Sequence, residues 1–131
     1  MRLVENKKKY WEFIRSLRNL QGVKEGFIQQ DHITAEDHEQ FMAKYGENYY
    51  ICLIEDKQAG FVGVIDDDIR VATCPRFQKL GVAKFMINEL LKLHPTSVAK
   101  VKIENEASLK LFESCGFIKR YIILEKPAQR G

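Results

Sequence analysis

The sequence predicts an α+β, or mixed α/β, fold in a single domain that spans residues 1–131. Strand-like runs joined by short turns occupy its middle, helical periodicity lies on either side, and it contains no repeat or linker. A hydrophobic content of 45% and a charged content of 30% are typical of a globular protein. No apolar run approaches the roughly 20 residues of a membrane helix.

The first part of the chain predicts a strand and two helices. Arg2–Val4 can form a short strand, and one helix face follows within Asn6–Asn19, where apolar side chains recur at helical spacing. Two glycines in residues 21–26 interrupt this pattern. A second helix begins after Thr34, a suitable N-cap, and ends at Gly46.

The rest of the chain predicts a β-meander followed by alternating helices and strands. Short turns between strands imply antiparallel neighbours. The three meander strands are expected at 48–56, 58–66 and 68–74. The later elements are a helix at 81–93, a strand at 97–103, a helix at 105–114 and a last strand at 117–126.

Charge and cysteine usage narrow the partners and the compartment. The net charge of +3 suits an anionic ligand, but the lysines are spread out, so we expect no nucleic-acid partner. The start of the chain has no apolar signal region, and we expect no membrane partner. The three cysteines are scattered and odd in number, which favours reduced thiols and a cytoplasmic location.

The stretch Gln78-x-x-Gly81-x-Ala83 lies where a strand and a loop lead into the helix at 81–93. A helix N-terminus leaves its first N–H groups unpaired and carries partial positive charge, so it binds phosphates readily. Gly81 has no Cβ to block the approach of a phosphate to the backbone. Taken alone, this six-residue pattern is also explained by a glycine that only serves helix packing.

A second motif, in residues 104–117, favours the phosphate site over the packing explanation. It contains Asn105 before a helix, then Phe112, and the pair Gly116-Phe117 after the helix. Together, the loop 78–83 and this motif resemble the two acetyl-CoA signatures of the GCN5-related N-acetyltransferase (GNAT) superfamily. The resemblance implies a central, mostly antiparallel, twisted sheet with a V-shaped splay between two parallel strands. About four helices would flank this sheet.

The resemblance also implies acetyl-CoA as cosubstrate, with no metal. Backbone groups at the end of the strand before the loop would pair with the pantetheine arm, and one N–H, at Val71 or Ala72, would polarise the thioester carbonyl. Phe112 stands where many relatives carry a tyrosine that protonates the leaving thiolate, so the general acid is unassigned. The implied cofactor-binding residues are Val71, Ala72, Thr73, Gln78, Lys79, Leu80, Gly81, Val82, Ala83, Asn105 and Phe112.

Three consecutive aspartates at 66–68 supply a candidate general base. Such a triplet is explained by turn chemistry alone. Asp67, however, lies 11 residues before Gln78, where the histone-modifying members of the superfamily carry a glutamate base. The resemblance therefore implies Asp67 as the catalytic residue. His32 and His38 are other candidates, with His38 expected on the surface of its helix.

The N-terminal half resembles sugar-nucleotide amine acetyltransferases and ribosomal-protein N-terminal acetyltransferases, because Arg18 and Asn19 match an Arg-Asn pair of that branch. This implies that both residues bind the acceptor; Arg18 is equally explained as a helix-end cation. The expected reaction is direct attack by a primary amine on acetyl-CoA. The acceptor would be a nucleotide-linked amino sugar or another small amine. A peptide N-terminal acetyltransferase and a catalytically silent acetyl-CoA-binding module are the alternatives, and a homodimer is left open.

Overall fold

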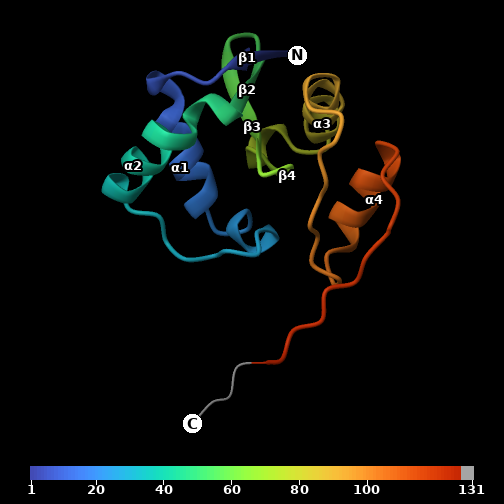
Figure 1. Ribbon diagram of the computed structural model, residues 1–131. Helices are drawn as coiled ribbons and strands as arrows, with labels where there is room; N and C mark the ends of the chain where they lie inside the picture. The colour runs from blue at the N-terminus through green and yellow to red at the C-terminus, as the bar shows by residue number, and fades with distance from the viewer. Residues whose placement is uncertain (128–131) are drawn as a thin grey trace.

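The computed structural model describes residues 1–127, which form one sheet between two groups of helices (Figure 1). The sheet has the strand order β1-β2-β3-β4, and all neighbouring strands are antiparallel. The strands are β1 (Arg2–Glu5), β2 (Tyr49–Ile54), β3 (Lys57–Ile65) and β4 (Asp68–Thr73). The α-helices are α1 (Trp11–Asn19), α2 (Ala35–Tyr45), α3 (Val82–Leu93) and α4 (Glu106–Ser114). Short 3₁₀ helices lie at Lys8–Tyr10, Lys24–Gly26, Gly46–Asn48 and Pro75–Phe77.

Two tight turns set the register of the meander. Glu55 and Asp56 both have positive φ, 49° and 66°, between β2 and β3. Asp66 and Asp67 repeat this between β3 and β4, with φ of 52° and 63°. Two consecutive left-handed residues match the type I′ turn, whose twist suits a two-residue hairpin. The aspartate triplet is therefore a hairpin turn that leads directly into β4.

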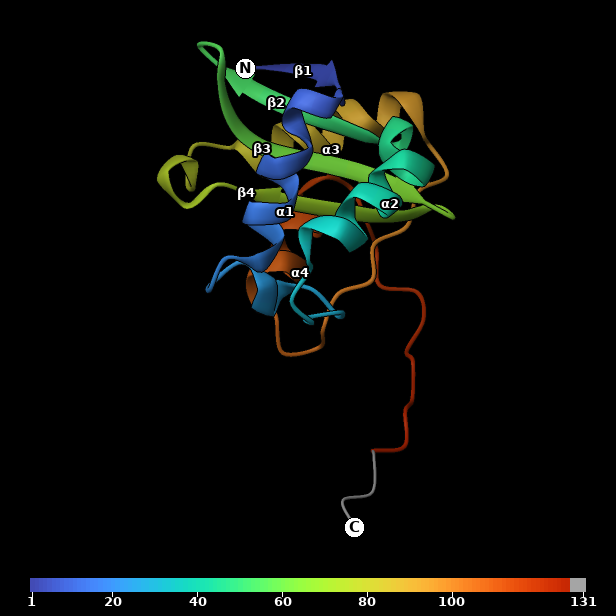
Figure 2. The ribbon, with the colours of Figure 1, turned by 90° about the vertical axis from the view of Figure 1, so that its left-hand side faces the viewer.

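The sheet carries a hydrophobic core on each face. Tyr49 and Phe61 are fully buried on the face covered by α1 and α2 (Figure 2). Val62, Met86 and Leu90 are fully buried on the face covered by α3 and α4. The alternation of strand side chains between faces divides the apolar residues of β2 and β3 between these two cores.

Gly63 is needed where it stands, because a Cβ on it would lie 2.6 Å from the ring of Tyr49. That ring is 2% exposed, and its centroid lies 5.8 Å from the centroid of Phe61. A larger residue at 63 would displace Tyr49 and the aromatic packing around it. The glycine therefore fixes an aromatic side chain that also lines the pocket described below.

Side chains cap the starts of α2 and α4, and the cap at Thr34 was predicted from the sequence. Thr34 Oγ1 accepts a hydrogen bond from the backbone N–H of Asp37 at 3.1 Å, which starts α2. Asn105 Oδ1 accepts from the backbone N–H of Ser108 at 3.2 Å, which starts α4. Each cap satisfies one of the unpaired N–H groups of a first helical turn. The sequence predictions for both helix starts are confirmed.

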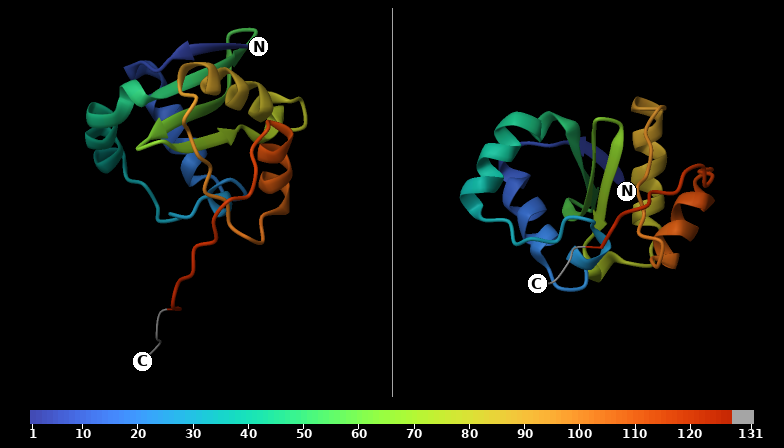
Figure 3. Two further views of the ribbon diagram at one scale, coloured as in Figure 1. Left: turned by 45° about the vertical axis from the view of Figure 1, so that its right-hand side comes forward. Right: turned by 60° about the horizontal axis from the view of Figure 1, so that its bottom comes forward.

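The segment 97–103, predicted as a strand, pairs with the sheet at one point only. A parallel bridge joins Asp68 to Val98; the Ile69 N–H donates to the Val98 carbonyl at 2.9 Å, and the Val98 N–H donates to the Asp67 carbonyl at 2.7 Å. No further backbone hydrogen bond joins this segment to β4, so it is not a strand. Beyond the bridge, β4 and the segment 97–103 diverge (Figure 3). The V-shaped splay is present, but its second arm is an extended segment.

The last predicted strand, 117–126, is also absent. Phe117 donates its N–H to the Phe112 carbonyl at 3.0 Å, and the chain then leaves the body of the molecule as an extended trace (Figure 1). High strand propensity cannot hold an isolated segment, because a strand needs a neighbour for its backbone groups and side chains. The four helices and the antiparallel sheet confirm the predicted fold class. Within residues 1–127, no helix is long and apolar enough to cross a membrane.

Candidate active site

The cleft between β4 and the segment 97–103 exposes unpaired backbone groups of β4. Successive residues of a strand direct their backbone groups to opposite sides. Ile69 donates toward Val98, across the cleft, whereas Cys74 donates to the Ala59 carbonyl on the β3 side. Among described residues, the N–H groups of Val71 and Thr73 therefore face the cleft without a backbone partner.

Ala72 has the opposite orientation. Its backbone groups face β3, where it is opposite Phe61, and its side chain is 7% exposed within the core against α1 and α2. The sequence left the polarising N–H open between Val71 and Ala72. The alternation of β4 favours Val71, because only this N–H opens into the cleft. The side chain of Val71 packs against the core on the α3 side.

The loop before α3 has the geometry of an anion site. Gly81 is the N-cap of α3 with φ of 78°, and a Cβ placed on it would meet no atom within 4 Å. The N–H groups of Val82, Ala83 and Lys84, in the first turn of this 12-residue helix, have no preceding helical carbonyl. No acidic residue lies in that turn. The open space, free N–H groups and helix dipole suit a pyrophosphate.

The other loop residues divide between core and solvent. Val82 is 1% exposed and anchors the start of α3 in the core, whereas Leu80 is 58% exposed. Lys79 has a left-handed backbone with φ of 65°, so residues 79 and 81 together turn the chain into the helix. Gln78 ends the 3₁₀ helix that begins at Pro75. These backbone turns present the peptide groups, rather than large side chains, at the helix mouth.

Helix α4 and its N-cap contain Asn105, Ser108 and Phe112, and Asn105 is not among the residues that line the pocket. The Oδ1 of Asn105 is occupied by its cap, and among the described contacts its Nδ2 donates no hydrogen bond. Ser108 and Phe112 are one helical turn apart, so they share a face. Both line the pocket described next, and the Phe112 ring lies 5.2 Å from the ring of Phe117 in an edge-to-face pair.

A pocket of about 740 Å³ joins the cleft to the helices of the N-terminal half. It brings the predicted acceptor residue Arg18 together with the predicted cofactor residues Val71 and Phe112. This volume suits a small molecule. Its polar and charged lining residues are Arg18, Gln29, Asp31, His32, Asp37, His38, Tyr49, Asp68, Arg70, Lys100 and Ser108.

Two guanidinium groups in this pocket have no carboxylate partner among described residues. Arg18 stacks on Phe27 at 4.0 Å from the ring centroid and donates to the Gln29 carbonyl at 3.2 Å. Arg70 lies 6.0 Å from the centroid of Phe41. Burial lowers the pKa of Arg18 below its ordinary value, and the charge of Arg70 lowers it further. Two half-buried, uncompensated cations form a site for an anion.

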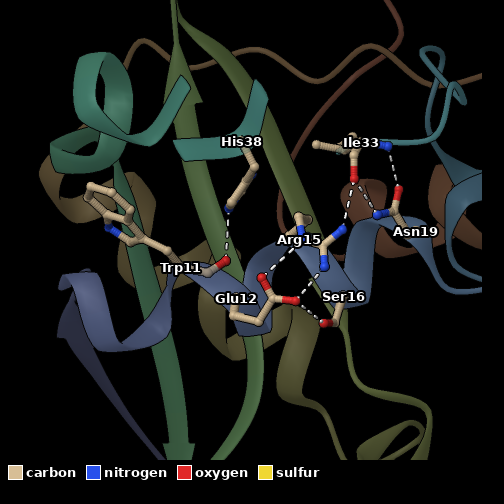
Figure 4. Close-up of polar contacts among 7 residues, drawn as sticks. All are labelled: Trp11, Glu12, Arg15, Ser16, Asn19, Ile33 and His38. Atoms are coloured by element: carbon tan, nitrogen blue, oxygen red, sulfur yellow. Dashed lines mark hydrogen bonds and ion pairs between the residues drawn. The ribbon is translucent and has the colours of Figure 1, made fainter. Parts of the chain in front are cut away.

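Two further groups in the pocket are buried and uncharged near neutral pH. Burial raises the pKa of Tyr49, so its phenol keeps its proton. His38 is 5% exposed, which corrects its predicted surface position: α2 packs this side chain against α1. His38 Nε2 lies 2.8 Å from the carbonyl of Trp11 (Figure 4), so Nε2 donates and Nδ1 is left as an acceptor. Burial lowers the pKa of His38.

The aspartates of the hairpin turn lie in two different places. Asp67, the predicted base, lines a small hollow of about 240 Å³ together with Asn48 and His94, and Thr96 Oγ1 donates to its carboxylate at 3.3 Å. It is not among the residues that line the large pocket. Asp68, one residue later, does line that pocket. Asp67 is the last residue of the turn and Asp68 is the first residue of β4, so the two adjacent carboxylates line different spaces.

Asn19, predicted to bind the acceptor, holds a loop in this structure. Its Nδ2 donates to the Ile33 carbonyl at 2.8 Å, and its Oδ1 accepts from the Ile33 N–H at 2.8 Å (Figure 4). Arg15 Nη1 donates to the same carbonyl at 3.1 Å. The side chain therefore fastens the loop between α1 and α2, which forms one wall of the pocket, and does not itself line the pocket.

Arg70, Tyr49 and Lys100 line the pocket but were not singled out from the sequence. The signal for Arg70 was present, because a charged residue inside an otherwise apolar strand must face a polar environment or a partner. Tyr49 carried no comparable signal, since an aromatic residue at the start of a strand is ordinary core material. Its place in the pocket depends on tertiary packing.

A sheet that splays beside a helix N-terminus with free N–H groups, and a pocket at the split, is the arrangement expected of a coenzyme A-dependent transferase. The model of the acetyltransferase (GNAT) family matches residues 11–117. The chain belongs to this family, and it is an acetyl-CoA-dependent N-acetyltransferase with acetyl-CoA as its cosubstrate.

Solved structures share the fold at low sequence identity. Spermidine N-acetyltransferase from Vibrio cholerae, in complex with CoA and spermine, has a TM-score of 0.84 at 19% identity over 99% of this chain and 88% of that one. Ribosomal-protein-alanine N-acetyltransferase from Brucella melitensis has a TM-score of 0.75 at 13% identity over 88% and 83% of the two chains. A comparison with curated protein sequences gives no match.

Proposed function

We propose that this acetyltransferase acts on a primary amine carried by a small anionic molecule, of which a nucleotide-linked amino sugar is the leading example. The observation behind this proposal is the pair Arg18 and Arg70, which line one pocket without a carboxylate partner in the described chain. A guanidinium presents a fork of donors that suits phosphate and carboxylate oxygens. Lys100 adds a third cation to the same lining.

The proposed reaction is a direct transfer. The neutral amine attacks the thioester carbonyl, a C–N bond forms, the C–S bond breaks, and coenzyme A leaves as a thiolate. The N–H of Val71 stabilises the oxyanion that develops on the carbonyl oxygen. The thiolate takes its proton from solvent, because Phe112 has none to give and a thiol pKa of roughly 8.5 makes the thiolate a tolerable leaving group.

The proton lost by the amine needs an acceptor. The sequence favoured Asp67, and the pocket favours Asp68, because only Asp68 lines the space in which the amine would lie. We propose Asp68 as the base, with Asp67 as the alternative acting from the neighbouring hollow. The two carboxylates can be distinguished because one conservative change removes each in turn.

A cationic acceptor is the second candidate. Asp31, Asp37 and Asp68 line the same pocket, and carboxylates suit a polyamine such as the spermidine named for the Vibrio cholerae enzyme. Asp31 and Asp37 are exposed, so Asp68 is the one half-buried carboxylate of the three. Two cations, Arg18 and Arg70, are half-buried. Because an uncompensated charge costs more when it is buried, the guanidinium pair favours the anionic acceptor. A peptide N-terminus and a silent acetyl-CoA-binding module are the remaining alternatives.

The remaining expectations complete the proposal. Asn105 is proposed to bind the pantetheine through its free Nδ2, and Gln78 to Ala83 to hold the pyrophosphate. We propose a cytoplasmic location, since the three cysteines are free thiols in the structure.

An acceptor panel tests the proposed function. Thiol release from acetyl-CoA would be measured with a nucleotide-linked amino sugar, the free amino sugar, spermidine and a peptide with a free N-terminus. We expect the highest kcat/KM for the nucleotide-linked sugar and at least a tenfold loss when the nucleotide is removed. A higher kcat/KM for spermidine or for the peptide would overturn the anionic acceptor. Tight acetyl-CoA binding without thiol release for any acceptor would establish the silent module.

A further inference from the structure

Within the C-terminal segment 117–126, the apolar side chains after Phe117 have no partner among the described residues. Figure 1 shows this segment extending away from the sheet and helices. Its large apolar side chains are exposed by 70–90%: Ile118 72%, Tyr121 86%, Ile122 82%, Ile123 70% and Leu124 90%. Neither hydrophobic core includes these side chains. A contiguous apolar run of this kind marks an interaction surface.

The backbone of the segment is also unpaired. The last backbone hydrogen bond of the described chain joins the Phe117 N–H to the Phe112 carbonyl, and residues 118–126 make none. The composition is rich in β-branched and aromatic residues, which favour strands. A segment with strand propensity, exposed apolar side chains and free N–H and C=O groups is a template for pairing with another strand.

We propose that the occupant is a second copy of this chain, and that the two segments pair as antiparallel strands about a two-fold axis at Ile122. In this register Ile122 faces its own copy, Tyr121 faces Ile123, and Arg120 faces Leu124 of the other protomer. Lys119 faces Glu125, and symmetry repeats this ion pair on the other side of the axis. An isologous contact uses the same surface on both subunits, so the arrangement closes as a dimer.

Charge selects this register over its neighbours. An axis at Ile123 would place Arg120 opposite Lys126, which is unfavourable between directly opposed cations. An axis at Tyr121 would place Lys119 opposite Ile123 and leave Glu125 without a cation. A parallel, in-register pair would place Lys119 opposite Lys119 of the other copy. Among these arrangements, the axis at Ile122 alone pairs opposite charges without opposing like charges.

The open edge of residues 97–103 in the same chain is a poorer partner. It carries Lys100 and Lys102, and the C-terminal segment brings Lys119, Arg120 and Lys126 to it. Like charges oppose closure within one chain. The dimer does not depend on the identity of the acceptor.

Sedimentation equilibrium of the full chain tests the proposal over a range of concentrations. We expect the mass to approach twice 15.3 kDa. Ile122→Lys places two like charges at the two-fold axis, and it should return the mass to that of the monomer. Leu93→Lys is the matched control, because Leu93 is an exposed apolar side chain, 57% accessible, at the end of α3. This control should leave the dimer intact.

A charge exchange tests the register. Lys119→Glu and Glu125→Lys should each weaken dimerisation by at least severalfold, because each creates an opposed pair of like charges. The double variant should restore the wild-type dissociation constant. A wild-type chain that stays monomeric at all concentrations overturns the proposal, as does a dimer that survives Ile122→Lys. Failure of the double variant to recover would overturn the antiparallel register.

Discussion

The backbone N–H of Ile69 donates to the carbonyl oxygen of Val98 at 2.9 Å, and beyond this contact no backbone hydrogen bond joins β4 to the segment 97–103. This bond marks the vertex of the cleft. Two residues further along β4, the N–H of Val71 points the same way and has no backbone partner in the described chain. An arm that binds like a strand can therefore enter the cleft and meet preorganised donors.

Replacing Val71 by proline removes the N–H that is proposed to polarise the thioester. The ladder with β3 should survive, because this N–H does not face β3, and proline is tolerated on such an edge. We expect kcat to fall by roughly 10²–10³-fold, the usual cost of one oxyanion donor. Steady-state kinetics measure this change, and circular dichroism checks the fold.

Thr73→Pro is the matched control, since Thr73 also directs its N–H into the cleft. That substitution should weaken acetyl-CoA binding and leave kcat much less affected. An unchanged kcat in a folded Val71→Pro protein would contradict the assignment of the oxyanion donor.

Gly81→Glu should abolish acetyl-CoA binding. The position has φ of 78°, and the space above it is open, so a carboxylate placed there would occupy and repel the proposed phosphate site. Isothermal titration calorimetry with coenzyme A should show affinity reduced by at least a hundredfold. Gly22→Glu controls for backbone strain, because Gly22 has φ of 90° and equally open surroundings. Near-native affinity for coenzyme A in Gly81→Glu would contradict the proposed phosphate site at the start of α3.

The elements that sequence reasoning predicted share a local cause. Helix spacing, the Thr34 cap and the short turns of the meander all depend on neighbours within a few residues, and they are confirmed. The segments 97–103 and 117–126 had the composition of strands, but the described part of the chain supplies no neighbouring strand for either of them beyond the single bridge at Val98. Propensity predicts a strand only when a neighbouring strand is present.

The site divides in the same way. The loop ending at Gly81 could be predicted from the sequence because its proposed function depends on the backbone of one continuous segment. The pocket draws Arg18 from α1, Tyr49 from β2 and Arg70 from β4. No sequence spacing predicts that these three side chains line the same pocket. The difference between Asp67 and Asp68 likewise depends on which space each carboxylate lines in the folded chain.

Separate substitutions of Asp68 and Asp67 identify the base. Each change to asparagine keeps size and polarity and removes basicity. We expect Asp68→Asn to lower kcat/KM by about 10²-fold or more near neutral pH. Part of that loss should return at high pH, where the free amine is already deprotonated. A pH–rate profile for each variant checks both expectations. A large loss in Asp67→Asn with normal Asp68→Asn turnover would assign the base to Asp67.

The guanidinium pair should control acceptor affinity. Arg18→Ala and Arg70→Ala should each raise KM for a nucleotide-linked amino sugar by roughly tenfold, as expected when a charge-assisted hydrogen bond of about 1.5–3 kcal/mol is lost. KM for acetyl-CoA should remain near the wild-type value. Arg2→Ala is a suitable control, because Arg2 pairs with Asp56 at 2.7 Å on the surface and does not line the pocket. An acceptor KM that is unchanged in both Arg18→Ala and Arg70→Ala would contradict the anionic acceptor.

His38 should make the stability of the fold depend on pH. Burial lowers its pKa in the folded state, while the unfolded chain keeps the ordinary value near 6.5. The unfolded state therefore binds the proton more readily, so the free energy of unfolding is largest above pH 6.5 and falls as the pH decreases through the folded-state pKa. Thermal unfolding measured from about pH 8 to about pH 5 should show a Tm that falls toward the acidic end of this range.

His38→Gln should flatten this dependence, because glutamine can still donate to the Trp11 carbonyl but does not titrate. His32→Gln is the control, since His32 is an exposed histidine of the same pocket. The pKa of Glu12 is lowered chiefly by its hydrogen bond with Arg15. Its stabilising contribution is therefore lost only at more acidic pH, below the ordinary glutamate value of 4.5. The window above pH 5 therefore reports His38. A wild-type Tm that is level across this window, or a slope retained in His38→Gln and lost in His32→Gln, would contradict the assignment.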